Sequence, residues 1–206
     1  SGGFLPTNSL NTIIKTPNQK FFYLISLVIS FINIFFIFNL FKKGAIIRKH
    51  QEDLFLIIFF LIISIILILF LKDKKLLDIL ISVASCLSNS GISITKMPDN
   101  FTLYFLFITI IGGSLISNSS GVKLSRFYIL LKISSSEIIK LISPNSVMNK
   151  SIFNSDNKIS DENIKTSFLI FISFFLSLFL LSSFLVLDNI GFEQSFKLSI
   201  LALTNT

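Results

Sequence analysis

The sequence is poor in the residue types on which disulfide-rich domains, metalloenzymes and soluble proteins depend. Its one cysteine, Cys86, excludes a disulfide bond within the chain, and its one histidine, His50, stands among Lys and Arg residues. Scattered acids and a single imidazole offer neither paired carboxylates nor a cluster of metal ligands, so we predict that the chain is not an enzyme. Only 14% of its residues are charged, against roughly a quarter in soluble domains, which argues against a soluble fold.

The sequence is instead rich in apolar residues. Hydrophobic residues make up 52% of the chain, Phe alone accounts for 25 residues, and the mean hydropathy is +0.81. Because one soluble core cannot bury so much apolar surface, we predict an all-α polytopic membrane protein in a lipid bilayer. The net charge of +7 comes from Lys and Arg residues that lie mainly between the apolar runs, so it indicates membrane topology and not a nucleic-acid partner.

Three apolar runs are long enough to cross a bilayer core of about 30 Å as helices. They cover residues 21–41, 54–71 and 168–187. Two further runs, residues 76–87 and 192–203, are shorter, and such segments at membrane depth are buried helices or re-entrant loops. The basic segments 42–49 and 123–165 are expected on the cytoplasmic side, so that both short segments enter the membrane from outside.

The order of full-length span, half-length helix and small polar tract occurs twice. Tracts follow both short segments, and Ser1-Gly2-Gly3-Phe4 looks like the tail of one more. Glycine permits backbone turns that aim carbonyl oxygens at one axis, and such oxygens can replace the hydration shell of a cation. No acidic residue lies in these tracts, which favours a monovalent cation such as potassium over calcium. The predicted filter residues are Gly2, Gly3, Ser88, Asn89, Ser90, Gly91, Thr204, Asn205 and Thr206.

Residues 101–116 form an apolar run that a cluster of Gly, Ser and Asn residues interrupts before the basic residues Lys123 and Arg126. The cluster occupies residues 112–121, and this composition predicts a break in a helix near the middle of its path. Two plainer interpretations stay open: a surface loop, or glycines that let helices pack closely.

These features together resemble the Trk/Ktr/HKT superfamily of potassium transporters, and within it the TrkH-type bacterial subunit. Gly3 and Gly91 match the glycines of the family's filter loops, and Asn205-Thr206 matches the start of the last filter. The family's glycine-rich segment, GGS-x-x-STAGGIK-x-x-R, forms an intramembrane gating loop beneath the filter, and Asn118 and Ser120 depart from its pattern. The gating-loop residues that the resemblance implies are Gly112, Gly113, Ser114, Ser119, Gly121, Lys123 and Arg126.

The resemblance implies repeated units of transmembrane helix, pore helix, filter loop and transmembrane helix around a central pore. Residues 1–52 would end the second unit, residues 53–165 would form the third with its gating loop at 112–121, and residues 166–206 would begin the fourth, as a piece of a longer protein. The implied function is potassium uptake across the bacterial inner membrane by a multi-pass, pore-forming subunit. It further implies a homodimer and a cytoplasmic nucleotide-binding regulatory subunit, with potassium as the transported substrate and no covalently bound cofactor.

Two other functions stay open at this point. A secondary carrier for a small solute also uses broken helices, but it calls for ionisable residues inside the spans, and the three predicted spans, residues 21–41, 54–71 and 168–187, contain none. A membrane-embedded enzyme would need a cluster of acids, histidines or metal ligands at a membrane face. Within the potassium interpretation, Lys123 and Arg126 are hypothesised to repel cations when the path is shut.

Overall fold

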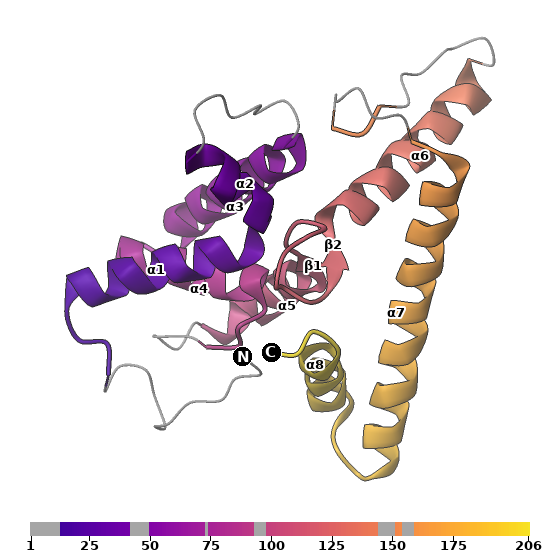
Figure 1. Cartoon of the computed structure of the whole chain (residues 1–206). Coiled ribbons are helices and arrows are strands. Elements are labelled where there is room, and N and C mark those ends of the chain that lie inside the picture. Colours follow the sequence, from indigo (N-terminus) through magenta and orange to yellow (C-terminus); the bar gives the residue numbers. More distant parts are fainter. Residues whose placement is uncertain (1–12, 42–49, 73, 93–97, 144–150, 154–158) are drawn as a thin grey trace.

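The computed structural model describes residues 13–41, 50–72, 74–92, 98–143, 151–153 and 159–206. This part of the chain is mainly helical, which confirms the predicted fold class (Figure 1). The helices are α1 (Pro17–Phe31), α2 (Ile34–Phe41), α3 (Gln51–Phe70), α4 (Leu76–Ser88), α5 (Thr102–Ile110), α6 (Leu124–Ile142), α7 (Asp161–Leu187) and α8 (Phe192–Leu203). A short 3-10 turn, Asp99–Phe101, precedes α5.

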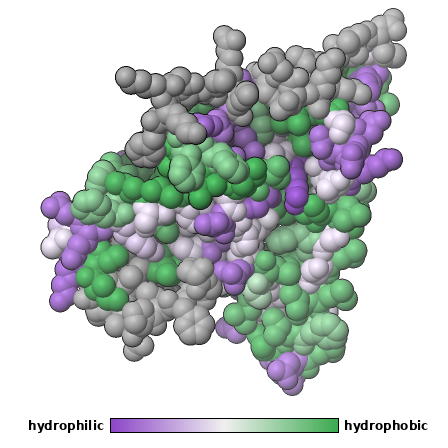
Figure 2. All heavy atoms as spheres, in the orientation of Figure 1, coloured by the Kyte–Doolittle hydropathy of each residue, from purple (hydrophilic) through white to green (hydrophobic). Residues whose placement is uncertain are grey.

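Within the described residues, two helices, α3 and α7, are long and apolar enough to cross a membrane. Both were predicted, and both begin earlier than their apolar runs. At α7 the Ser160 side chain accepts the Asn163 N–H, which caps the helix before Asp161 and Glu162 in its first turn. Apolar side chains cover the part of the molecule where α7 and α8 lie (Figure 2), and Phe184 of α7 is 66% exposed, as expected of a surface that faces lipid.

The predicted single span over residues 21–41 is wrong. Helix α1 ends at Phe31 and α2 begins at Ile34, with Ile32 and Asn33 in extended or irregular backbone between them. The freed Asn33 N–H donates to Asp53 Oδ1 over 2.9 Å, and Asp53, in the first turn of α3, is 1% exposed. A buried carboxylate from another helix pairs the freed backbone group and so allows the break. Hydropathy does not register such a contact, and it therefore predicted an unbroken helix.

The half-length segments are α4 and α8, and each packs against the long helix that precedes it, α4 on α3 and α8 on α7 (Figure 1). Helix α1 lies along α4, where the Lys20 ammonium is 2.6 Å from the Asp78 carboxylate. The main core is built around Phe31, Leu56 and Leu87. These contacts fix the direction in which α4 enters the molecule.

Between α5 and α6 the chain leaves the helical conformation. Two short strands, β1 (Ile111–Gly112) and β2 (Val122–Lys123), pair in parallel, with Ile111 opposite Val122 and Gly112 opposite Lys123. They close a loop, residues 113–121, next to the C-terminal end of α8 (Figure 1). Helices α6 and α7 then form a hairpin that returns the chain to a second core around Leu106, Leu178 and Ile200.

We expect Asp53→Ala to lower the free energy of unfolding by about 1–3 kcal/mol, because it leaves the Asn33 N–H buried without its acceptor. Asp53→Asn keeps an acceptor oxygen and should retain most of the stability. Asp161→Ala, which also removes a carboxylate from the first turn of a long helix but an exposed one, is the matched control. Equal losses for Asp53→Ala and Asp161→Ala in unfolding of the full-length protein in detergent would contradict this role of Asp53.

Candidate functional site

Helix α4 ends in a turn that its own sequence specifies. Asn89 adopts the left-handed conformation at φ 53°, its N–H reaches the Cys86 carbonyl at 3.2 Å, and the Ser90 N–H reaches back to the Ser85 carbonyl at 3.1 Å. Asparagine is among the few residues that accept this conformation at low cost. The bond from Ser90 back to Ser85 is typical of a Schellman ending, which satisfies carbonyls that the helix leaves open.

Helix α8 ends in the same turn. Asn205 has φ 54°, its N–H lies 3.3 Å from the Ala202 carbonyl, and the Thr206 N–H lies 2.9 Å from the Leu201 carbonyl. The bonds span the same numbers of residues as those at α4. Ser88-Asn89-Ser90 and Thr204-Asn205-Thr206 are therefore equivalent positions of one structural repeat, here called the α4 tract and the α8 tract.

The structure brings these two predicted tracts together. Gly91, which follows the α4 tract, has φ +66°, and a side chain placed there would lie 2.6 Å from the carbonyl carbon of Thr206. Only glycine fits both this backbone conformation and this approach. Gly2 and Gly3, the other predicted filter glycines, lie outside the described residues.

A network of hydroxyl groups supports the α4 tract. The Ser85 hydroxyl donates to the Ile92 carbonyl over 2.7 Å and lies 2.8 Å from the Ser90 hydroxyl, while the Ser88 hydroxyl donates to the Ser85 carbonyl over 3.2 Å. The sequence analysis missed Ser85. Its position four residues before the left-handed Asn89 is the only signal that could have suggested it.

The α8 tract is supported by threonine hydroxyls. Thr204 Oγ1 donates to the Ile200 carbonyl over 2.8 Å and lies 2.7 Å from Thr206 Oγ1, which itself reaches the Leu201 carbonyl at 3.2 Å. Thr204 is completely buried. The same backbone turn is therefore held by different side chains in the two tracts.

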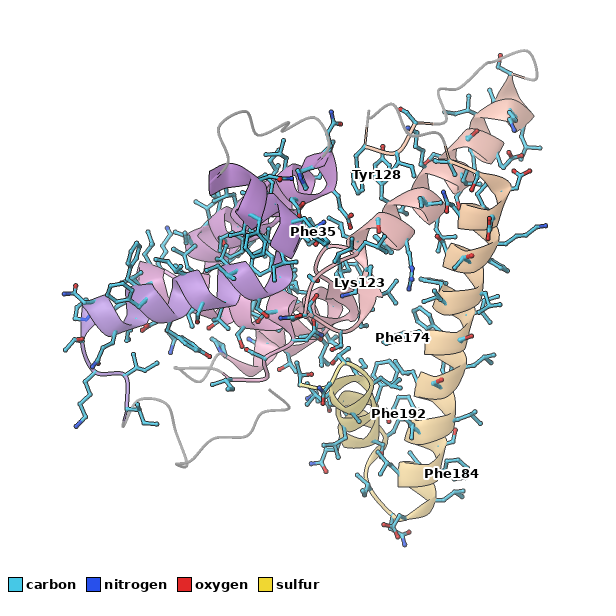
Figure 3. The ribbon with its side chains drawn as sticks, in the orientation of Figure 1. Phe35, Lys123, Tyr128, Phe174, Phe184 and Phe192 are labelled. Atoms are coloured by element: carbon cyan, nitrogen blue, oxygen red, sulfur yellow. The ribbon has the colours of Figure 1, made fainter. Side chains whose placement is uncertain are left out.

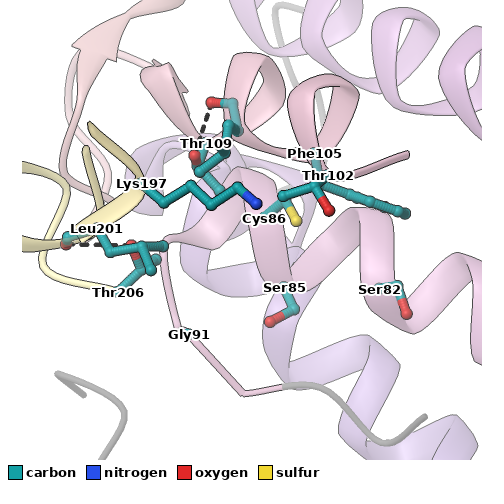
Figure 4. A pocket seen from close by; sticks show the side chains of 11 residues that line it. Ser82, Ser85, Cys86, Gly91, Thr102, Phe105, Thr109, Lys197, Leu201 and Thr206 are labelled. Atoms are coloured by element: carbon teal, nitrogen blue, oxygen red, sulfur yellow. Dashed lines mark hydrogen bonds between the residues drawn. The ribbon is translucent and has the colours of Figure 1, made fainter. Parts of the chain in front are cut away.

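A cavity of about 280 Å³ lies between α4, α5 and α8, beside Gly91 and Thr206 (Figure 4). Its lining is mainly apolar, with Phe105 and Leu201 among its side chains, and also includes hydroxyl groups of α4 and α5. Lys197 of α8 lines it too, with its ammonium 2.5 Å from Glu193 one turn earlier. None of the described residues that line the cavity is acidic. Across the described part of the chain, no three His, Cys, Asp or Glu side chains are grouped to hold a metal ion.

The loop at 113–121 is held by its own hydroxyl groups. Gly113 N–H donates to Ser119 Oγ over 2.7 Å, and the Ser117 hydroxyl donates to the Ser114 carbonyl over 2.7 Å. The Lys123 ammonium turns toward the loop, where it donates to the Ser119 carbonyl and reaches Ser117 Oγ at 3.2 Å (Figure 3). Of the predicted gating-loop residues, Gly113, Ser114, Ser119 and Lys123 therefore lie in one hydrogen-bonded cluster that Lys123 braces.

Glycines let this loop pack closely. A side chain at Gly113 would collide with the Phe31 carbonyl oxygen at the end of α1, and Gly121 has φ +77°. The Ser114 N–H also donates to Phe31, over 3.0 Å. Arg126, the next positively charged residue after Lys123, is half-buried in the first turn of α6. The glycine positions are thus set by contact with α1 and by the turn into β2.

The loop also contacts α3. The Leu115 N–H donates to Glu52 Oε1 over 2.8 Å. Glu52 directly precedes Asp53, whose carboxylate accepts the Asn33 N–H. Sequence reasoning did not identify Glu52 because the contact joins positions far apart in the chain. The first turn of α3 therefore accepts backbone N–H groups from two non-helical segments, the break between α1 and α2 and the loop.

The backbone arrangement has a close counterpart among solved structures. The crystal structure of the potassium transporter TrkH from Vibrio parahaemolyticus superposes with a TM-score of 0.82 over 98% of this chain, at 18% sequence identity. The chain has the TrkH fold. It spans 46% of the length of that transporter. No protein-family model matches the sequence, and no curated protein matches it.

We expect Lys123→Gln to speed amide hydrogen exchange across residues 113–121, because the ammonium that joins Ser117 and Ser119 is lost. Arg126→Gln is the matched control, since it removes a neighbouring positive charge but none of the hydrogen bonds that Lys123 donates to the loop. Exchange measured by mass spectrometry on the full-length protein in detergent tests this. Equal exchange in wild type and Lys123→Gln would show that Lys123 does not brace the loop.

Proposed function

We propose that the chain belongs to the pore-forming subunit of a Trk-type potassium uptake system. The observation that carries the proposal is the meeting of two half-length helices, α4 and α8, which end in the same turn and bring Gly91 against Thr206. The TrkH fold supports it, because the solved structure with that fold is a potassium transporter. The two tracts then supply oxygens to the ion in two of the pore's repeated units.

The electrostatics of the two tracts favours a monovalent cation. Each tract follows the C-terminal end of a helix, which carries a partial negative charge of roughly half an elementary charge. Neither tract contains a carboxylate, so its oxygens come from carbonyl, hydroxyl and amide groups. Such a site attracts a weakly hydrated cation without the strong charge that calcium sites use.

The loop at 113–121 acts in this proposal as the gate beneath the filter. Its hydrogen bonds to α1, α3 and the α8 tract hold it in one defined position. The resemblance further suggests a multi-pass protein of the bacterial inner membrane, a homodimer and a cytoplasmic nucleotide-binding regulatory subunit. The chain's proposed role is transport and not catalysis, with potassium as substrate.

A secondary carrier is the second candidate, and one observation favours it. Glu52 and Asp53 lie in the first turn of α3 and the broken helix α1–α2 packs on them, which is the kind of site that binds coupling ions in carriers. Both carboxylates already accept backbone N–H groups, from Leu115 and Asn33, which favours a structural role. Flux that required a proton or sodium gradient would support the carrier.

We expect Gly91→Ser to reduce potassium uptake roughly tenfold or more and to lower selectivity over sodium. A side chain at this position strains the left-handed backbone and collides with Thr206, a combined penalty of more than about 1.4 kcal/mol. Gly191→Ser is the matched control, because a side chain at Gly191 meets open space.

The measurement is potassium and sodium uptake by the full-length protein in cells that lack their own potassium transporters. Wild-type uptake of potassium with loss in Gly91→Ser alone supports the filter. If the wild-type protein takes up no potassium, the proposed function is wrong. If Gly91→Ser leaves uptake and selectivity unchanged, the assignment of Gly91 to the filter is wrong.

A further inference from the structure

One hydrogen bond joins the loop to the α8 tract, and another joins the α4 tract to the helix that precedes the loop. The Asn89 side-chain amide of the α4 tract donates over 2.8 Å to the carbonyl of Thr109, in the last turn of α5 just before the loop. At the other end of the loop, the Ser120 hydroxyl donates to the carbonyl of Thr204 in the α8 tract. The α8 tract is therefore tied to the loop itself, and the α4 tract to the last turn of α5.

The Asn89 bond is buried, and the Ser120 bond is half-buried on the Ser120 side. Asn89 and Thr109 are 4% and 5% exposed, and Thr204 is not exposed at all. A carbonyl in a buried residue that loses its donor is left with an unsatisfied acceptor, so the Ser120 hydroxyl stabilises one position of the Thr204 carbonyl. The Ser120 bond is thus a constraint on the α8 tract as well as on the loop.

The backbone fixes where the Ser120 side chain can point. Gly112 of β1 packs so closely on the Ser120 carbonyl that a side chain at Gly112 would collide with it. Gly121, with φ +77°, then turns the chain into β2. With its peptide held by these neighbours, Ser120 directs its hydroxyl at the α8 tract. The glycine-rich pattern that this segment resembles has glycine at this position, and glycine has no hydroxyl to donate.

We propose that Ser120 is a positioning residue of the filter, which couples the loop at 113–121 to the Thr204 carbonyl of the α8 tract. When the loop moves, the carbonyl loses its donor and is released for a cation or for rearrangement. Coupling of this kind is reciprocal: if loop position changes the affinity of the filter for potassium, potassium shifts the loop equilibrium by the same factor. This inference rests on the proposed function, because it assigns the tracts to an ion filter.

The test uses the full-length protein with Ser120→Ala, with Ser120→Thr to restore a hydroxyl, and with Ser135→Ala as the matched control. Ser135 is exposed on α6, where its hydroxyl bonds only the Leu131 carbonyl of its own helix. Amide exchange of residues 113–121 and 200–206 is followed in choline buffer and across a potassium titration. Potassium uptake is measured in parallel, both as maximal rate and as the concentration that gives half-maximal uptake.

In wild type and in Ser135→Ala, we expect potassium to change the exchange of the loop. In Ser120→Ala we expect faster exchange of residues 200–206 in choline, and a shift of roughly fivefold or more in the potassium concentration that half-protects the loop. Ser120→Thr should restore the wild-type midpoint. A role confined to local stability would speed exchange but leave that midpoint unchanged.

The inference is overturned if the Ser120→Ala midpoint equals that of wild type, or if Ser135→Ala shifts it equally. That result leaves the proposed function standing where wild type takes up potassium. Absence of uptake and of any potassium effect on exchange in wild type would instead overturn both.

Discussion

Backbone groups buried without water must find partners inside the protein, and this constraint decides how each interrupted helix of the chain is built. A continuous helix such as α7 satisfies its own N–H and carbonyl groups, but the break after α1, the ends of α4 and α8, and the loop after α5 do not. At each of these places a short polar side chain supplies the missing bond. Asp53 serves the break, asparagine and hydroxyl residues serve the two tracts, and serines serve the loop.

The proposed function depends on the same interruptions. A tract that ends its helix early leaves carbonyl groups outside the helical ladder, where a cation can use them. Neighbouring hydroxyls hold each tract through bonds to the end of its own helix. The first turn of α3 links the other two interruptions, since Glu52 holds the loop and Asp53 holds the break. The irregular parts of the molecule thus form one connected network.

The sequence predicted well the features that arise from local composition. The uninterrupted apolar runs at α3 and α7 and the short segments at α4 and α8 were all found, because hydropathy and length determine them. The glycine-rich loop was placed correctly between α5 and α6, since no helix tolerates that composition. The α4 and α8 tracts were likewise recognised from the sequence, because each has an asparagine between two hydroxyl residues.

What failed or was missed depends on contacts between distant positions. The run over residues 21–41 is interrupted by only two serines and two asparagines, and its break at Asn33 depends on Asp53, which no local pattern links to it. The roles of Thr109 and Glu52 follow from the packing of α5 and α3 against the α4 tract and the loop, whereas Ser85 was missed although its partners are close in sequence. Serine is common in this chain, so composition alone could not single out these positions.

The repeated helix pairs also bear on the order in which parts of the protein assemble during synthesis. Helices α3 and α4, like α7 and α8, are adjacent in sequence and joined by short connections, so each hairpin with its asparagine turn has low contact order. Such a hairpin is complete soon after its last residue leaves the ribosome. The pairing of α1 with α4 is different, because the Lys20–Asp78 contact joins residues 58 positions apart. Synthesis therefore delivers finished hairpins first and assembles them against earlier helices afterwards.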